Sequence, residues 1–134
     1  MTPGVQYENL RDFGFGARTG IELPGEVSGT LRRPDRWTSQ SSASLAIGYE
    51  ISVTPLQMAM AYGALANGGD LMQPRMIRET RDSDGAIVEH FGSQKIRRVI
   101  SQSVASVVGQ TLVDVVEDGT GTLARLGSFR VAGK

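Results

Sequence analysis

The clearest periodic pattern of apolar residues lies between residues 54 and 67. Apolar or small side chains recur there at helical spacing, and they occupy more than one face of the predicted helix. The main face contains Leu56, Ala59, Met60 and Gly63, and the apolar surface is extended by Met58, Ala61, Tyr62 and Leu65. A helix that is apolar on several sides is expected to be buried on several sides.

Capping residues mark both ends of this predicted helix. Thr54 can act as the N-cap, Pro55 suits the first helical position, and Gln57 completes a Thr-x-x-Gln capping box. Asn67-Gly68-Gly69 follows the last apolar residue and supplies residues that tolerate positive φ. The helix is therefore expected to end there.

A β-hairpin is predicted after this helix. Two short runs, Met76–Thr80 and Ala86–His90, flank the sequence Asp82-Ser83-Asp84-Gly85. Aspartate, serine and glycine favour tight turns, so the chain is expected to reverse at this point.

A second apolar stripe at helical spacing begins after Ser101, which suits an N-cap. Its members are Val104, Val107, Val108, Leu112, Val115 and Val116. Because β-branched residues lower helix propensity, tertiary burial must stabilise this helix, which is expected to end at Asp118-Gly119. The run from Ser128 to Ala132 predicts the beginning of a strand.

The first part of the chain lacks such periodicity. From Met1 to about Ile47, proline, glycine and serine indicate extended segments and turns wrapped over another surface, and residues 1–53 are expected to be irregular or extended. Long irregular segments are uncommon in compact domains unless they serve a function or are disordered. This region is expected to line a site or to depend on a surface outside the chain.

Composition narrows the possible functions. Hydrophobic residues make up 40% and charged residues 21% of the 134 residues, as in a single soluble globular domain. Fourteen basic residues balance fourteen acidic residues, which disfavours nucleic acid as a partner. The absence of cysteine excludes disulfides and thiolate catalysis. No apolar run approaches the roughly 18 residues of a membrane span, so we expect a soluble chain.

The residues that commonly carry chemistry form no catalytic constellation. His90 is the only histidine, so no histidine cluster for a metal exists, and we expect an exposed hairpin residue. Turn formation accounts for Asp82 and Asp84. The cluster Arg32, Arg33, Arg36 and Trp37 is read as a solvated surface turn rather than a nucleic-acid site. The residues alone indicate an α/β or α+β piece that is either a binding module or part of a larger enzyme.

Several strings, taken in order, resemble the transpeptidase domain of class B penicillin-binding proteins, the serine enzymes that cross-link peptidoglycan. The matching strings are Phe13-Gly14-Phe15-Gly16, Thr19-Gly20-Ile21-Glu22-Leu23-Pro24-Gly25-Glu26, Ser52-Val53-Thr54-Pro55-Leu56-Gln57-Met58-Ala59, Ala66-Asn67-Gly68-Gly69, Gly119-Thr120-Gly121-Thr122-Leu123-Ala124 and Val131-Ala132-Gly133-Lys134. The resemblance implies a partial transpeptidase fold over residues 1–134, similar to serine β-lactamases, with a buried central helix, a hairpin, a second helix and the start of the Lys-Thr-Gly strand.

The sequence departs from the family at the catalytic motifs. Glycine and valine stand three places before Lys95 and Lys134, so no Ser-x-x-Lys motif supplies a nucleophile, and no Ser-x-Asn motif is present. Lys134 matches the first residue of Lys-Thr-Gly, whereas Arg18-Thr19-Gly20 only mimics that motif. Many relatives have Gly-Gln-Gly where this chain has Gly48-Tyr49-Glu50, which questions whether the same tight turn forms.

The resemblance implies a parent enzyme on the extracytoplasmic face of the bacterial cytoplasmic membrane, anchored by a helix absent here and acting in cell division or cell shape. Its substrates would be peptidoglycan stem peptides, it would be acylated by β-lactams, and no cofactor or metal is implied. Lys134 is the one catalytic residue carried over, with an electrostatic role beside the serine, and a solvated ammonium is the alternative.

Two hypotheses remain open for this chain. The first is a piece of a serine D,D-transpeptidase that is inactive alone, because it lacks the nucleophile and its activating lysine. The second is a non-catalytic module of the same fold family that binds a peptide or protein. Under the first hypothesis, the apolar helix over residues 54–67 is expected to leave a patch that drives self-association or binding of the missing parts of the domain, whereas a compact monomer would favour the second.

Overall fold

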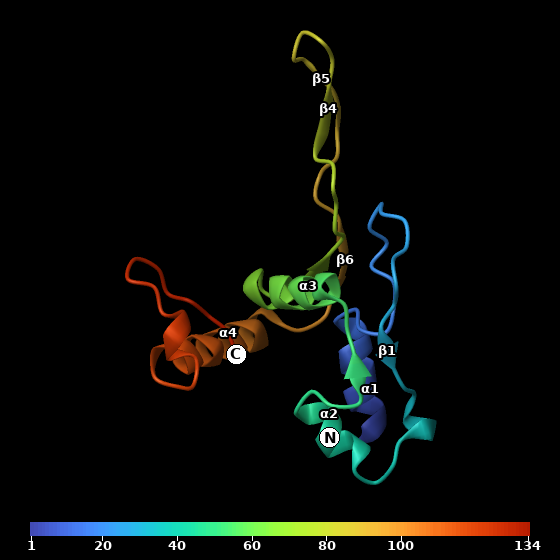
Figure 1. Cartoon of the computed structure of the whole chain (residues 1–134), viewed down its shortest axis with the longest axis vertical. Coiled ribbons are helices and arrows are strands. Elements are labelled where there is room, and N and C mark those ends of the chain that lie inside the picture. Colours follow the sequence, from blue (N-terminus) through green and yellow to red (C-terminus); the bar gives the residue numbers. More distant parts are fainter.

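The computed structural model describes residues 1–134, the whole chain (Figure 1). The helices are α1 (Pro3–Asp12), α2 (Ser41–Ala46), α3 (Pro55–Ala66) and α4 (Gln102–Glu117), with short 3-10 helices η1 (Pro34–Arg36) and η2 (Thr122–Ala124). The strands are β1 (Thr30–Leu31), β2 (Ile51–Ser52), β3 (Asp70–Met72), β4 (Glu79–Arg81), β5 (Ile87–His90) and β6 (Lys95–Arg98). They form three antiparallel pairs, β1 with β2, β3 with β6 and β4 with β5, so the fold is mixed α and β.

The predicted helix at residues 54–67 is confirmed as α3, including its capping box. The Gln57 amide nitrogen of the backbone donates to Thr54 Oγ1 at 3.1 Å, and the Thr54 backbone amide donates to Gln57 Oε1 at 2.9 Å. The expectation that α3 is buried on several sides is wrong for this chain. Only one side packs on β3 and α4, which leaves Met58 40% and Tyr62 38% exposed.

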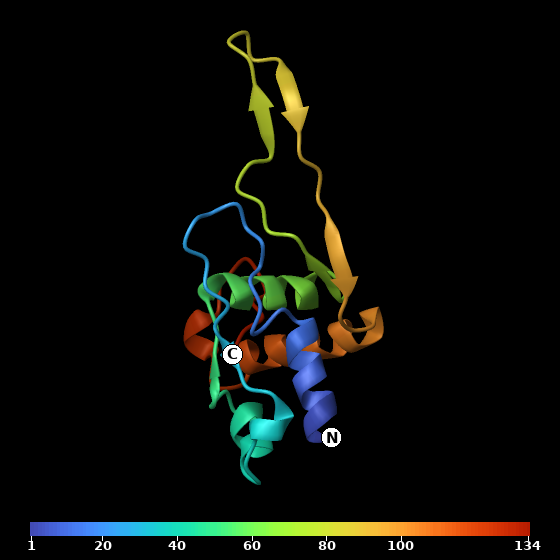
Figure 2. The same ribbon diagram turned by 90° about the vertical axis from the view of Figure 1, so that its right-hand side faces the viewer.

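The second predicted helix is confirmed as α4. Ser101 caps it by accepting a hydrogen bond from the Val104 backbone amide at 3.2 Å, and Asp118 is the C-cap. Ala105 and Val116 are buried on the side that meets the rest of the molecule, whereas Val104 and Val107 are exposed. In both views α4 runs alongside α3 (Figures 1 and 2). This helix pair and β3 hold most of the small core.

The predicted hairpin is confirmed as β4 and β5, although its first strand, Glu79–Arg81, begins later than the expected run Met76–Thr80 and ends one residue beyond it. The Asp82 carboxylate accepts hydrogen bonds from the backbone amides of Asp84 at 3.0 Å and Ala86 at 2.9 Å, so it stabilises the turn. The hairpin projects as an arm far from the helices (Figure 2).

The pair β3–β6 connects this arm to the body and has no counterpart in the sequence prediction. Its register pairs Asp70 with Arg98 and Leu71 with Arg97. Leu71 is 1% exposed and packs beneath α3, which makes it a central residue of the core. The pairing joins segments 23 or more residues apart, so local sequence patterns carry little information about it.

The expectation that residues 1–53 are irregular or extended is wrong at the start of the chain, where a helix forms. Several short helices and strands also interrupt the rest of this segment. Residues Pro3–Asp12 form α1, whose N-cap Thr2 accepts from the Val5 backbone amide at 3.4 Å. No residue of α1 is buried, so it lacks the apolar stripe that would have revealed it. Short elements α2, η1, β1 and β2 interrupt the remainder.

The strand predicted over Ser128–Ala132 does not form. This segment has no neighbouring strand, and a strand requires a hydrogen-bonding partner. Instead the Gly133 backbone amide donates to the Leu112 carbonyl at 3.0 Å, so the end of the chain lies against α4.

Few residues of the molecule are buried from solvent. Nine of 134 residues are buried, and the accessible surface is 9249 Å². A compact folded chain of this length is expected to expose about 6,800 Å², so roughly 2,400 Å² more is open than in a self-contained domain. No helix has the length and apolar character needed to cross a membrane.

Candidate functional site

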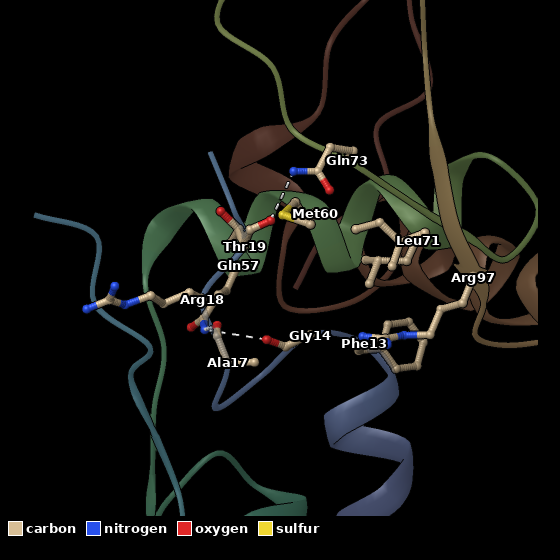
Figure 3. Close-up of a pocket in the computed structure, with 11 residues that line it drawn as sticks. Phe13, Gly14, Ala17, Arg18, Thr19, Gln57, Met60, Leu71, Gln73 and Arg97 are labelled. Atoms are coloured by element: carbon tan, nitrogen blue, oxygen red, sulfur yellow. Dashed lines mark hydrogen bonds between the residues drawn. The ribbon is translucent and has the colours of Figure 1, made fainter. Parts of the chain in front are cut away.

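Loop residues that are distant in the sequence meet at Gln57, on the first turn of α3 (Figure 3). Its side chain is 1% exposed. The Nε2 atom donates to the carbonyls of Ala17 at 2.6 Å, Ser28 at 2.8 Å and Gly14 at 3.4 Å. Because Oε1 also caps the helix at Thr54, one side chain fastens two distant loop segments to the start of α3.

A cavity of about 300 Å³ lies beside Gln57, between residues 13–19 and the elements α3, β3 and β6. Phe13, Met60 and Leu71 supply apolar surface, whereas Arg97 and Gln73 supply polar groups. In Figure 3 the Arg97 side chain runs alongside Phe13, and its Nε donates to the Asp12 carbonyl at 2.9 Å. No serine or paired carboxylates line this cavity, so it lacks the groups needed for acyl transfer.

The loop from Thr19 to Glu26 is closed by its last residue. The Thr19 backbone amide and hydroxyl each donate to Glu26 Oε1 at 2.5 Å, and the Gly20 backbone amide donates to Oε2 at 3.1 Å. The hydrogen bond from the Thr19 side chain is the largest cause of a lowered pKa for Glu26. Burial opposes this shift, while the backbone amides and the Arg18 cation add to it.

A second polar cluster surrounds Glu50, in the turn where the sequence departs from Gly-Gln-Gly. The turn forms with Gly48 at φ 88° and Glu50 at φ 60°, and Glu50 is the one non-glycine residue with positive φ. The fully buried Ser41 hydroxyl donates to Glu50 Oε2 at 2.8 Å, and Arg32 forms an ion pair with the same oxygen. These contacts compensate for the unfavourable backbone conformation.

Lys134, the candidate catalytic residue, is exposed at the end of the segment that lies against α4. It lines none of the cavities described here, and the cavity beside Gln57 is formed by other segments. The structure therefore places Lys134 and the Gln57 cluster at separate positions.

The other residues that the sequence analysis considered for a functional role lie in the hairpin and in a surface turn. His90 is 58% exposed on β5, with Nδ1 3.8 Å from the Glu79 carboxylate. The Trp37 indole donates to the Arg32 carbonyl at 2.8 Å within an exposed turn. No group of three His, Cys, Asp or Glu side chains is arranged to hold a metal ion. Reasoning from sequence alone did not single out Gln57 or Glu26 as polar anchors, although both lie in the strings that suggested the family.

Comparison with known proteins assigns the family. Residues 4–134 match the family described as the penicillin binding protein transpeptidase domain. The match covers nearly the whole chain, so this protein belongs to that family and the resemblance inferred from the motif strings is confirmed.

Two curated relatives illustrate the match. The chain is 40% identical over 135 residues to penicillin-binding protein PbpB of Mycolicibacterium smegmatis, covering 96% of this chain and 21% of that protein. It is 36% identical over 129 residues to stage V sporulation protein D of Bacillus subtilis, covering 96% of this chain and 20% of that protein. The chain spans about a fifth of the length of these relatives.

Solved structures support the fold. Penicillin binding protein 3 from Mycobacterium tuberculosis superimposes with a TM-score of 0.83 at 39% identity, covering 94% of this chain and 30% of that one. A peptidoglycan synthetase from Bifidobacterium adolescentis gives a TM-score of 0.87 at 30% identity, covering 98% of this chain and 24% of that one. The architecture is therefore part of the penicillin-binding transpeptidase fold.

Proposed function

We propose that this chain is a structural part of a serine D,D-transpeptidase that cross-links peptidoglycan stem peptides and is acylated by β-lactams. The observation that carries the proposal is the match of residues 4–134 to the family's transpeptidase domain, in a fold shared with penicillin-binding proteins. The parent enzyme would act at the extracytoplasmic face of the cytoplasmic membrane.

Acyl transfer needs groups that this chain does not contain. A serine must attack the carbonyl of the stem peptide, and a lysine must help remove its proton. No Ser-x-x-Lys motif is present, so the chain alone is expected to be inactive. In the assembled site Lys134 would bring a positive charge close to the serine and the substrate carboxylate.

The open surface of the chain supports assembly with a complementary part. The surface exceeds that of a compact chain of this length by roughly 2,400 Å², more than a standard interface buries on one partner. A groove of about 340 Å³ between α3 and α4 contains Tyr62, Leu65 and Leu112 on its walls. A covering segment would bury these apolar side chains.

Labelling with a fluorescent penicillin tests this function. The chain alone is expected to form no covalent adduct. The chain refolded with the segment of PbpB from Mycolicibacterium smegmatis that precedes the matched region is expected to form one. Lys134→Ala should weaken labelling of that assembly without preventing association, and Arg130→Ala provides a matched control on the same segment. A stoichiometric adduct on the chain alone would overturn the proposal.

The absence of a nucleophile together with the exposed groove favours one alternative, a non-catalytic module that binds a protein or peptide. The same refolding experiment separates the two functions. Association without any penicillin labelling, despite an intact nucleophile in the added segment, would favour the binding module.

A further inference from the structure

Three hydrogen-bond donors converge at the Thr19–Gly20 turn. The two successive backbone amides and the Thr19 hydroxyl all point at the Glu26 carboxylate, over distances of 2.5, 2.5 and 3.1 Å. Gly20 has φ 77°, and successive amides in such a turn form a concave site that suits an anion. The donors engage both carboxylate oxygens, so the geometry matches a carboxylate.

Other contacts hold these donors in place. Gln73 Nε2 donates to the Thr19 carbonyl at 3.3 Å and to the Gly20 carbonyl at 3.1 Å. The Thr19 hydroxyl oxygen also accepts from the Ile21 backbone amide at 3.3 Å, which directs its own hydrogen toward Glu26. Because Gln73 holds the Thr19 carbonyl on one side of its planar trans peptide, the Gly20 amide of the same peptide is directed to the other side, where it meets Glu26 Oε2.

The charge around the turn also favours an anion. The Thr19 hydroxyl, the two amides and the nearby Arg18 cation lower the pKa of Glu26, against a smaller opposing effect of burial. The residues between the turn and Glu26 contribute little packing, since Leu23 is 49% exposed and Pro24 and Gly25 are exposed as well. The carboxylate contact is therefore the main interaction that closes this loop.

We propose that the Thr19–Gly20 turn is a carboxylate-binding site and that Glu26 is its resident, intramolecular ligand. The site takes a carboxylate as a chemical class, because its donors engage two oxygens and a negative charge. Once the Glu26 carboxylate is removed, a small carboxylate from solution binds in its place and restores the closed loop.

Replacement of the resident ligand tests the proposal. Glu26→Ala should lower the melting temperature, and sodium acetate should restore part of the loss. At about 0.5 M acetate the expected rise is about 2–5 °C above that in sodium chloride of equal ionic strength. Glu22→Ala is the matched control in the same loop, since Glu22 is exposed and lies 4.0 Å from Arg75, and acetate should not raise its melting temperature above the chloride value.

Glu26→Gln gives an independent check, because the amide fills the site without a charge and acetate should then have no effect. If Glu26→Ala does not fold, the unaltered protein still tests the proposal by nuclear magnetic resonance. The amide resonances of Thr19 and Gly20 should shift with pH at a midpoint below 4.5, the ordinary pKa of a glutamate carboxyl. Equal effects of acetate and chloride on Glu26→Ala, or amide shifts with a midpoint at or above 4.5, would overturn the assignment.

Discussion

Every polar atom of the Gln57 side chain is hydrogen-bonded within the protein, and this single side chain makes four hydrogen bonds to the backbone. Its amide nitrogen binds the carbonyls of Gly14, Ala17 and Ser28, while its oxygen caps α3. The residue is buried, so water does not replace a lost bond easily. Its role is structural, since it positions the loop segments without contacting a reacting group.

Gln57→Leu should therefore destabilise the protein strongly. The apolar side chain fills a similar volume but leaves the Ala17 and Ser28 carbonyls and the helix cap without partners, at a cost of about 2–4 kcal/mol. Urea unfolding followed by circular dichroism measures the change. Gln110→Leu on the exposed side of α4 is the control and should alter the free energy of unfolding by no more than about 0.5 kcal/mol.

Glu50 combines an unfavourable backbone conformation with favourable side-chain contacts, so two substitutions separate these contributions. Glu50→Ala keeps φ near 60° and loses the Ser41 and Arg32 contacts, which should destabilise by about 1–2 kcal/mol. Glu50→Gly loses the same contacts but removes the conformational cost, so its stability should lie closer to that of the original protein. An alanine variant as stable as the glycine variant would contradict this account.

Stability should also depend on pH through Glu26. Its pKa is lowered in the folded state, so its contribution is present above the ordinary value of 4.5 and is lost as the pH falls through the folded value. Glu26→Gln should flatten this acid dependence, whereas Glu22→Gln should leave it. Thermal unfolding between neutral pH and about pH 3 compares the slopes of the three proteins.

At the scale of secondary-structure elements, the packing of β3 against the start of α4 depends on a close approach between the backbones of Gly69 and Ile100. Gly69 has φ 105°, and a Cβ atom there would lie 2.1 Å from the Ile100 carbonyl oxygen. The Val99 backbone amide also donates to the Gly69 carbonyl at 2.8 Å. The end of α3, strand β3 and the start of α4 are thus assembled around one glycine.

Gly69→Ala should separate these elements and destabilise by more than about 3 kcal/mol, because the clash involves backbone atoms that cannot rotate away. Gly25→Ala is the matched control. Gly25 also has positive φ, at 79°, but has no atom within 4 Å of the added Cβ, so about 1 kcal/mol is expected. Urea unfolding measures the loss of stability of both variants. Similar losses would show that the close approach of Gly69 to Ile100 does not cause the destabilisation.

Local signals explain which elements were predictable. The capping box of α3, the Ser101 cap of α4 and the Asp82 turn are encoded within a few residues, and all three are confirmed. Thr2 and Pro3 take the N-cap and first positions of α1, but the sequence that follows them is polar and has no apolar stripe, so this helix was not predicted. The pairing of β3 with β6 depends on distant residues, and the strand predicted at Ser128–Ala132 lacks a partner.

The polar site was predictable only in part. The motif strings indicated the family and included Gln57 and Glu26, yet the hydrogen bonds that join Gln57 to Ala17 and Ser28 span 40 and 29 residues of sequence. Such contacts follow from the packed fold and not from spacing along the chain. Lys134 was assigned from its motif alone, and its catalytic role remains a prediction.

At the scale of the whole molecule, the main feature is an accessible surface larger than that of a compact chain of the same length. The buried apolar side chains, Leu45, Ala61, Ala64, Leu71, Ala105 and Val116, form a core too small to stabilise 134 residues by the usual amount of apolar burial. The groove between α3 and α4 and the exposed Met58 and Tyr62 concentrate apolar surface on one side of the helix pair. The chain should therefore associate with another chain or with the rest of a domain.

Sedimentation of the chain alone at micromolar concentration should show species larger than a monomer, because pairing covers the apolar groove. Leu112→Glu should reduce this association by placing a charge in the groove, and Ser103→Glu on an exposed part of α4 should not. A compact monomer that unfolds cooperatively would show that the chain needs no partner.

The arm formed by β4 and β5 also has a practical consequence. Its two strands pair with each other and lie away from the helices, and residues 82–90 are all exposed. A guest peptide inserted between Ser83 and Asp84 would therefore disturb only the turn, and doubling the loop length costs about 0.6 kcal/mol in closure entropy. The tip of the arm is thus suited to carry a fluorescent or affinity reporter that follows the association of the chain without disturbing the core formed by α3, α4 and β3.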